Sequence, residues 1–175
     1  MRKAIITTAI ALCSFTGRAQ ESTGKLKMHA VNLGFGVFNA HKNATDASGL
    51  TFLADATFAL DKNLFSVSYL GGQEEAILAD TKYNFNELSL LYGREWRAAK
   101  WFSLEGFAGV GYYNQKIEDE ATDETEKKNT VSIPLRVNPK FYITKKFGLG
   151  FCINYSINSR ANNLSENLIF HYRFN

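Results

Sequence analysis

Ionisable side chains that could carry chemistry recur between apolar neighbours in this 175-residue chain. Glu105 lies in one such segment, and Arg136 and Lys140 lie in a later one. If the two segments pair as a hairpin, Glu105 faces position 138 and both cations are its diagonal neighbours. Such a cluster could line a gated polar path, or it could form buried ion pairs, because buried charge must be paired. We favour a structural ion-pair network with these members: Glu87, Glu95, Glu105, Arg136, Lys140 and Arg173.

The segment Ile117–Glu126 could bind a cation through its six carboxylates, and Lys127 and Lys128 follow it. Carboxylate oxygens are ligands that Ca²⁺ prefers, but this segment has neither the EF-hand spacing nor a fixed glycine turn. Such a run of charge is typical of a solvated loop. We therefore predict no metal site and no cofactor.

The elements that must position these groups show a period of two. Near the C-terminus every second residue is apolar or aromatic: Leu168, Phe170, Tyr172 and Phe174. The residues between them are polar: Asn167, His171 and Arg173. One apolar and one polar face in alternation are typical of a β-strand.

The same alternation predicts eight strands, near residues 27–39, 50–60, 64–71, 85–96, 101–113, 130–143, 147–158 and 164–174. The predicted connections alternate in length. They are tight at 61–63, 97–100 and 144–146, long at 40–49, 72–84 and 114–129, and intermediate at 159–163. This alternation is typical of an up-and-down barrel that spans a membrane. Pro134 and Pro139 fall in the sixth strand, where proline either counts against a strand or indicates an edge or a bulge.

The two faces of the predicted strands differ in residue size as well as in charge. The polar face carries most strand glycines, among them Gly34, Gly36, Gly109 and Gly111. An eight-stranded barrel has an interior just wide enough for side chains, so small residues suit its lumen. A soluble lipocalin-like barrel is the alternative, with an apolar cavity and a wet exterior. Since a wet exterior has room for Lys, Glu and Gln, we predict that the apolar face contacts lipid.

Aromatic residues lie at the expected ends of the strands. An aromatic girdle at the short turns is predicted from Trp96, Trp101, Phe147 and Phe174. A second girdle toward the long loops is predicted from Tyr69, Phe85, Tyr112 and Tyr155.

The N-terminus has the pattern of an export signal. Arg2 and Lys3 precede a short apolar run, and small residues precede Gln20. We expect residues 1–19 to be a cleaved signal peptide and residues 20–175 to be one barrel domain. A lipoprotein signal at Cys13 is the alternative, but Leu12 is large for the preceding position. Without Arg2, Lys3 and Arg18, the remaining 17 Lys and Arg equal the 17 Asp and Glu, so no basic stripe predicts nucleic-acid binding.

The whole predicted domain resembles the small OmpA/OmpX-type outer-membrane β-barrels of Gram-negative bacteria, and it resembles them in pattern rather than in one motif. The family's C-terminal signal usually ends on the aromatic residue, whereas Asn175 follows Phe174 here. The resemblance implies an all-β, eight-stranded antiparallel transmembrane barrel in the outer membrane of the cell envelope. It also implies outer-membrane lipid, lipopolysaccharide and the barrel-assembly machinery as partners.

A second resemblance concerns catalysis. The segment Asn154–Ser156, with Glu166 beyond it, is similar to the catalytic region of outer-membrane lipid A deacylases, which use His, Ser and a carboxylate. Asn154 stands where a histidine is expected, and Ser156 cannot become a nucleophile without a base. We therefore predict no catalytic residue.

We expect a monomeric, non-enzymatic scaffold with a plugged polar lumen and loops for an extracellular partner. A lipid A-modifying hydrolase and a narrow channel are the alternatives.

Overall fold

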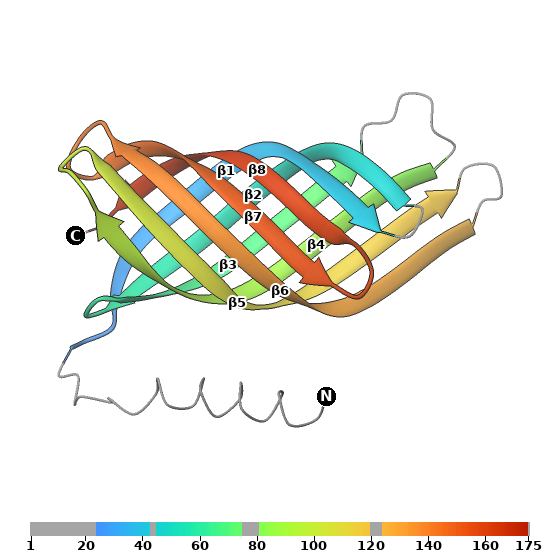
Figure 1. The fold of residues 1–175 in the computed structure, drawn as a ribbon, viewed down its shortest axis with the longest axis horizontal. Coiled ribbons are helices and arrows are strands. Elements are labelled where there is room, and N and C mark those ends of the chain that lie inside the picture. Colours follow the sequence, from blue (N-terminus) through green and yellow to red (C-terminus); the bar gives the residue numbers. More distant parts are fainter. Residues whose placement is uncertain (1–23, 43–44, 75–80, 120–123, 175) are drawn as a thin grey trace, which may run out of the picture.

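The chain folds as a closed antiparallel β-barrel (Figure 1). The computed structural model describes residues 24–42, 45–74, 81–119 and 124–174. Its strands follow one another around the barrel in chain order: β1 (Lys27–Lys42), β2 (Thr45–Leu60), β3 (Asn63–Glu74), β4 (Thr81–Arg97), β5 (Phe102–Asp119), β6 (Glu124–Tyr142), β7 (Phe147–Asn158) and β8 (Asn162–Arg173). The predicted fold class and strand number are confirmed.

The barrel closes where the last strand pairs with the first. β1 and β8 are antiparallel from Ala30 opposite Arg173 to His41 opposite Asn162. In Figure 1 the C-terminus lies at the end of the barrel that carries the turns β2–β3, β4–β5 and β6–β7, which we call the short-turn end. In the described part of the chain, no helix is long and apolar enough to cross a membrane. The expected signal peptide, residues 1–19, lies outside the described residues.

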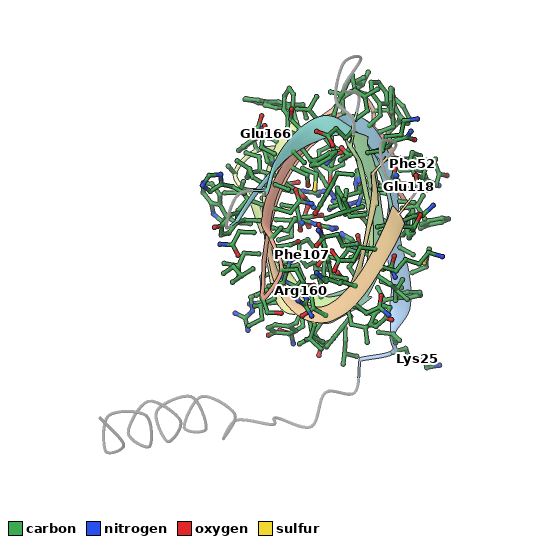
Figure 2. The ribbon with its side chains drawn as sticks, turned by 90° about the vertical axis from the view of Figure 1, so that its right-hand side faces the viewer. Lys25, Phe52, Phe107, Glu118, Arg160 and Glu166 are labelled. Atoms are coloured by element: carbon green, nitrogen blue, oxygen red, sulfur yellow. The ribbon has the colours of Figure 1, made fainter. Side chains whose placement is uncertain are left out.

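Alternation decides which side chains point inward. Figure 2 shows nitrogen and oxygen atoms gathered inside the barrel, and Phe52 on the outside. The apolar side chains of each strand are exposed on the outer surface, for example Leu33, Phe52, Leu90 and Ile133. The predicted division into an apolar outer face and a polar inner face is therefore confirmed for these positions.

The strands are longer than the sequence predicted. Residues 40–49 and 114–129 were expected to be loops, but β1 continues to Lys42 and β5 to Asp119, where Asp119 pairs with Glu124 of β6. The predicted loop 72–84 is likewise shortened, because β4 begins at Thr81. Backbone pairing needs no apolar side chain, so the ladder continues beyond the apolar belt although the alternation has ended.

The two prolines of β6 mark neither an edge nor a bulge. The ladder to β5 is interrupted beside Pro134, between the pairs Ala108–Leu135 and Gly111–Ser132. The ladder to β7 is interrupted beside Pro139. Both ladders resume in the same register, because a missing N–H removes a hydrogen bond without changing the residue count. The predicted edge or bulge is therefore wrong.

Two glycines of β5 differ in what surrounds them. A Cβ atom at Gly109 would lie 2.0 Å from the carbonyl oxygen of Leu90 on β4, so the strands can approach closely only because this residue is glycine. Gly106 faces outward, and a Cβ atom there would meet nothing within 4 Å.

This difference gives a matched pair of substitutions on one strand. Gly109→Val should lower the free energy of unfolding by about 1–3 kcal/mol through overpacking. Gly106→Val should leave it unchanged or raise it by up to about 1 kcal/mol, because valine suits a strand better than glycine does. Urea unfolding in lipid vesicles, followed by heat-modifiable gel migration, measures both variants. An equal loss of unfolding free energy in the two variants would contradict a close approach of β4 and β5 at Gly109.

Candidate functional site

The candidate site is the lumen, where side chains of all eight strands meet. Each strand contributes at least one member to a connected set of polar groups, which includes Asn32, Asp55, Ser68, Glu87, Ser103, Arg136, Asn154 and His171. All of these named residues are buried. The arrangement is possible because the inward position recurs at every second residue of each strand.

Glu105 and Lys140 form an ion pair that water does not reach. Lys140 Nζ lies 2.6 Å from Glu105 Oε2, and both side chains are fully buried. Asn138, which the hairpin register places opposite Glu105, donates from Nδ2 to the same oxygen at 3.2 Å. The predicted pairing of position 138 with Glu105 is confirmed. In low dielectric the attraction between the two charges is strong, so each is costly to remove alone.

Arg136 pairs with a carboxylate that the sequence did not identify as its partner. Its Nη1 lies 3.4 Å from Asp55 Oδ2, and its Nη2 donates to Ser68 Oγ at 2.7 Å. Its Nε donates to Asn154 Oδ1 at 3.3 Å. Arg136 was expected beside Glu105. The long side chain instead crosses the lumen from β6 to β2, which is a contact that hairpin register alone cannot predict.

Glu87 accepts hydrogen bonds from two serines on other strands. Ser156 Oγ donates to Oε2 at 2.6 Å, and Ser132 donates to Oε1. Asn154 Nδ2 in turn donates to Ser156 Oγ at 2.9 Å, which joins Glu87 to the Arg136 group. Charge-assisted hydrogen bonds of this kind stabilise a buried carboxylate, and none of the ion pairs among the described residues involves Glu87.

From Asp55 the hydrogen-bonded set continues through β1 to His171 of β8. Asn32 Nδ2 donates to Asp55 Oδ1 at 2.7 Å, and His171 Nδ1 donates to Asn32 Oδ1 at 2.7 Å. The Tyr142 hydroxyl oxygen lies 3.2 Å from His171 Nε2, and Ser103 Oγ donates to the same hydroxyl at 3.4 Å. The hydrogen bonds therefore run without a break from Glu87 to Ser103.

The short-turn end of the lumen holds the remaining predicted charges. Arg173 forms an ion pair with Glu95, and its guanidinium lies 5.0 Å from the centre of the Tyr142 ring. Arg97 lies 3.8 Å from the same Glu95 carboxylate. These contacts place Glu95 and Arg173 in one cluster, separate from the pair Asp55–Arg136.

Three groups at this end have the spacing of metal ligands. Ligand atoms of His29, Glu95 and Glu105 all lie within 4.8 Å of one another. Both carboxylates already contact a cation, Glu95 through Arg173 and Glu105 through Lys140. These positive charges oppose the binding of a metal cation, so the arrangement favours ion pairs over coordination.

The opposite end of the lumen holds a cluster of aromatic side chains, which the sequence prediction of a polar lumen missed. Phe38, Phe85 and Tyr113 pack together, with ring centres 4.9 Å apart for Phe38–Phe85 and 5.4 Å apart for Phe85–Tyr113. The Tyr83 and Tyr113 hydroxyls lie 2.8 Å apart. We call Phe38, Tyr83, Phe85 and Tyr113 the aromatic cap.

Phe85 was predicted to belong to an outer girdle, and that prediction is wrong because its side chain is buried in the aromatic cap. It lies two residues from Glu87, so it shares the inward face of β4 with that carboxylate. The spacing from Glu87 could therefore have placed it inside.

The outer surface carries the residues predicted to form the girdle at the short turns. Trp96 and Trp101 are exposed by 63% and 59%, and Phe147 and Phe174 are also exposed. Trp96 is near the end of β4, Phe147 begins β7 and Phe174 follows β8, so these three lie at the short-turn end. Exposed apolar area of this extent on a closed barrel requires an apolar solvent.

The acidic segment 118–126 is partly described, because residues 120–123 lie outside the described ranges. Lys116 pairs with Glu118 on β5, and Lys128 pairs with Glu126 on β6. The hydrogen bond from Lys116 lowers the pKa of the Glu118 carboxyl. Glu118 and Glu126 therefore each have an ammonium partner, which competes with Ca²⁺.

Comparison with known proteins agrees with this architecture. Ail, the attachment invasion locus protein of Yersinia pestis, superposes with a TM-score of 0.63 at 17% identity, over 83% of this chain and 97% of Ail. That protein was solved in complex with the heparin analogue sucrose octasulfate. Neisserial surface protein A superposes with a TM-score of 0.74 at 9% identity, over 86% of this chain and 99% of that protein. The N-terminal β-barrel domain of Pseudomonas aeruginosa OprF superposes with a TM-score of 0.57 at 14% identity, over 86% of this chain and 100% of that domain.

The closed eight-stranded barrel with its exposed apolar belt has the fold of these small outer-membrane β-barrels, as the sequence predicted. The chain belongs to the family described as Domain of unknown function (DUF2715), whose model matches residues 3–175. No curated protein sequence matches the chain.

The buried pair Glu105–Lys140 yields a test of the lumen. Lys140→Met should lower the free energy of unfolding by about 3–5 kcal/mol, because it leaves the Glu105 charge buried without its cation. The double variant Lys140→Met with Glu105→Gln removes both charges and should recover most of that loss. Urea unfolding in vesicles measures both, with Lys127→Met on the exposed part of β6 as the control. A double variant no more stable than Lys140→Met would contradict the ion pair.

Proposed function

We propose that this protein is a non-enzymatic outer-membrane scaffold with a closed interior, which presents the ends of its strands outside the cell. The observation that carries the proposal is the filled lumen, with a polar side chain from each strand in its hydrogen-bonded set and an aromatic cap above it. A barrel of this width leaves little room for solvent once such side chains occupy it.

The closed interior supports a rigid rather than a conducting barrel. Arg136 contacts three other strands through Asp55, Ser68 and Asn154, and each contact resists a shift of one strand past another. Buried charges paired in this way are immobile, whereas a conduction path needs polar groups that water reaches. The charges therefore favour a structural plug over a gate.

The outer ends of β5 and β6 support a role in surface interaction. Their pairing continues to Asp119 and Glu124, and the pairs Lys116–Glu118 and Lys128–Glu126 give this hairpin charge of both signs. Because barrels of this kind have short periplasmic turns, we infer that the short turns lie in the periplasm and that this hairpin lies outside the cell. We propose that it meets a polar extracellular partner, that the belt contacts outer-membrane lipid and lipopolysaccharide, and that the barrel-assembly machinery inserts the chain.

Planar-bilayer recording tests the closed interior. We expect no stable single-channel steps from the purified wild-type barrel, because the aromatic cap and the paired charges exclude a continuous water path. Phe38→Ala and Phe85→Ala combined with Arg136→Ala remove two rings of the cap and the guanidinium that crosses the lumen, and the triple variant should show increased conductance. Phe52→Ala on the outer face is the control and should not change it. Stable steps from the wild type would make the protein a narrow channel instead.

A lipid A-modifying hydrolase is the second candidate, because Ser156 contacts a carboxylate, Glu87, at 2.6 Å. Two observations weigh against it. Ser156 points into the lumen and is fully buried, whereas Glu166 is exposed on the outer face of β8. The neighbour of Ser156 is Asn154, whose amide cannot accept the serine proton as a histidine can.

Mass spectrometry of lipid A separates the two candidates. Expression of the wild-type protein in a host that lacks it should leave the lipid A mass unchanged, and Ser156→Ala should give the same spectrum. Outer-membrane fractionation and heat-modifiable migration show that both proteins are folded. A loss of acyl mass with the wild type that Ser156→Ala abolishes would overturn the scaffold in favour of the hydrolase.

A further inference from the structure

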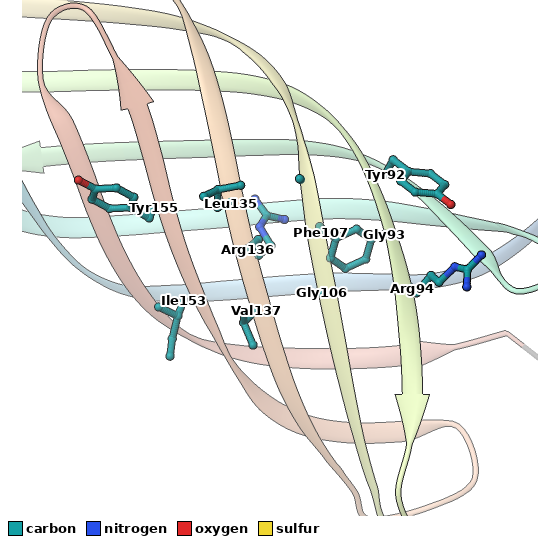
Figure 3. Close-up of a pocket in the computed structure, with 11 residues that line it drawn as sticks. Tyr92, Gly93, Arg94, Gly106, Phe107, Leu135, Arg136, Val137, Ile153 and Tyr155 are labelled. Carbon is teal, nitrogen blue, oxygen red and sulfur yellow. The ribbon is translucent and has the colours of Figure 1, made fainter. Parts of the chain in front are cut away.

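A groove of about 600 Å³ crosses the outer wall of the barrel over β4, β5, β6 and β7 (Figure 3). Its position is set by two small residues, Gly106 and Ala108, on the outward face of β5. Large side chains stand beside them on the neighbouring strands. Figure 3 shows Tyr92 on one side of Gly106 and Tyr155 on the other.

The register makes the groove continuous across the four strands. Tyr92 pairs with Ala108, Ala108 with Leu135, and Leu135 with Tyr155. Two residues nearer the short-turn end on each strand, Arg94 pairs with Gly106, and Gly106 pairs with Val137. The groove therefore follows a row of paired residues from strand to strand. Because barrel strands tilt by roughly 35–45°, a row of paired residues crosses the membrane obliquely.

The two ends of the groove lie at different depths. Arg94 is three residues before the end of β4 at Arg97, on the short-turn side. Tyr155 is three residues before the end of β7 at Asn158, on the opposite side. The groove thus runs from the periplasmic headgroup level at Arg94 into the apolar belt.

The end at Arg94 is basic and the rest of the groove is apolar. Arg94 donates from Nη2 to Asn63 Oδ1 at 3.4 Å, and the Tyr92 hydroxyl donates to the same oxygen at 2.9 Å. Asn63 is neutral, so this contact leaves the positive charge of Arg94 uncompensated by its hydrogen-bond partner. Lys62 and Asp61 are both exposed in the adjacent β2–β3 turn, so Arg94, Lys62 and Asp61 together carry a formal net charge of +1.

We propose that this groove binds an anionic phospholipid, with one acyl chain over Gly106 and Ala108 and the phosphate at Arg94. A narrow apolar hollow that begins at a guanidinium at headgroup depth matches a lipid tail joined to a phosphate, and guanidinium groups bind phosphate well. The proposal rests on the barrel lying in a bilayer. It does not depend on whether the lumen conducts or on what the extracellular hairpin binds.

The chain provides its own probe for the test. The sequence has two tryptophans, Trp96 and Trp101. Trp96 lies two residues beyond Arg94 on the same face of β4 and is exposed. With Trp101→Phe as background, Trp96 fluorescence is measured in phosphatidylcholine vesicles that contain increasing fractions of phosphatidylglycerol with brominated acyl chains. Brominated phosphatidylcholine is the reference lipid.

We expect half-maximal quenching at about fivefold lower mole fraction of the phosphatidylglycerol than of the reference, since one basic residue near a membrane surface contributes that much. Arg94→Gln should abolish the preference. Gly106→Leu, which fills the groove where a Cβ atom meets no other atom within 4 Å, should also abolish it. Ala56→Leu adds three carbon atoms to the outer face of β2, one fewer than Gly106→Leu adds to β5, and should keep the preference.

Three results would overturn the proposal. The first is equal quenching by the two lipids in the wild type. The second is a preference that survives in Gly106→Leu and in Ala108→Leu, which would assign it to Arg94 without a groove. The third is a cross-linked dimer in vesicles that both filling variants abolish, which would make the groove an interface between two copies. Heat-modifiable migration of each variant separates a lost lipid site from a barrel that failed to insert.

Discussion

The pairing of every strand on both sides is the constraint on which the rest of this structure depends. In a bilayer a backbone N–H or C=O group without a partner costs several kcal/mol, so a sheet that spans lipid must have no edge. The pairing of β8 with β1 meets that requirement. It also fixes the alternation of faces, since a closed ladder turns every second residue of every strand inward. Even the interruptions at Pro134 and Pro139 leave the register intact.

Closure with eight strands then decides what can lie inside. The lumen is narrow, so its residues must be small or must fit against one another. Glycine at position 109 lets β4 approach β5. The long side chain of Arg136 crosses the lumen to Asp55, and Lys140 reaches Glu105 on the neighbouring strand. The aromatic cap fills the other end with rings. The same closure leaves the outer wall in contact with lipid, and there small residues produce a hollow instead of a close approach.

The sequence predicted the strand number, the two faces and the position opposite Glu105, because each depends on a period of two or on one hairpin. It did not predict the ends of the strands at Asp119 and Glu124, since polar residues in water pair without any alternation. The pair Arg136–Asp55 was missed because β2 and β6 are not neighbours in the barrel, and sequence spacing carries no information across the lumen. Phe85 was assigned by its residue type, although its spacing from Glu87 placed it inside.

The lumen network has a consequence for the order in which this barrel is built. Asn32 of β1 is joined to His171 of β8, which lies in the last strand to be synthesised. Until that strand arrives, Asn32 lacks this partner, and an open sheet in lipid exposes charged groups such as Asp55 together with two unpaired strand edges. Each half-built sheet is therefore unfavourable on both its inner face and its borders. Polar complementarity inside the lumen thus disfavours the insertion of single strands into lipid.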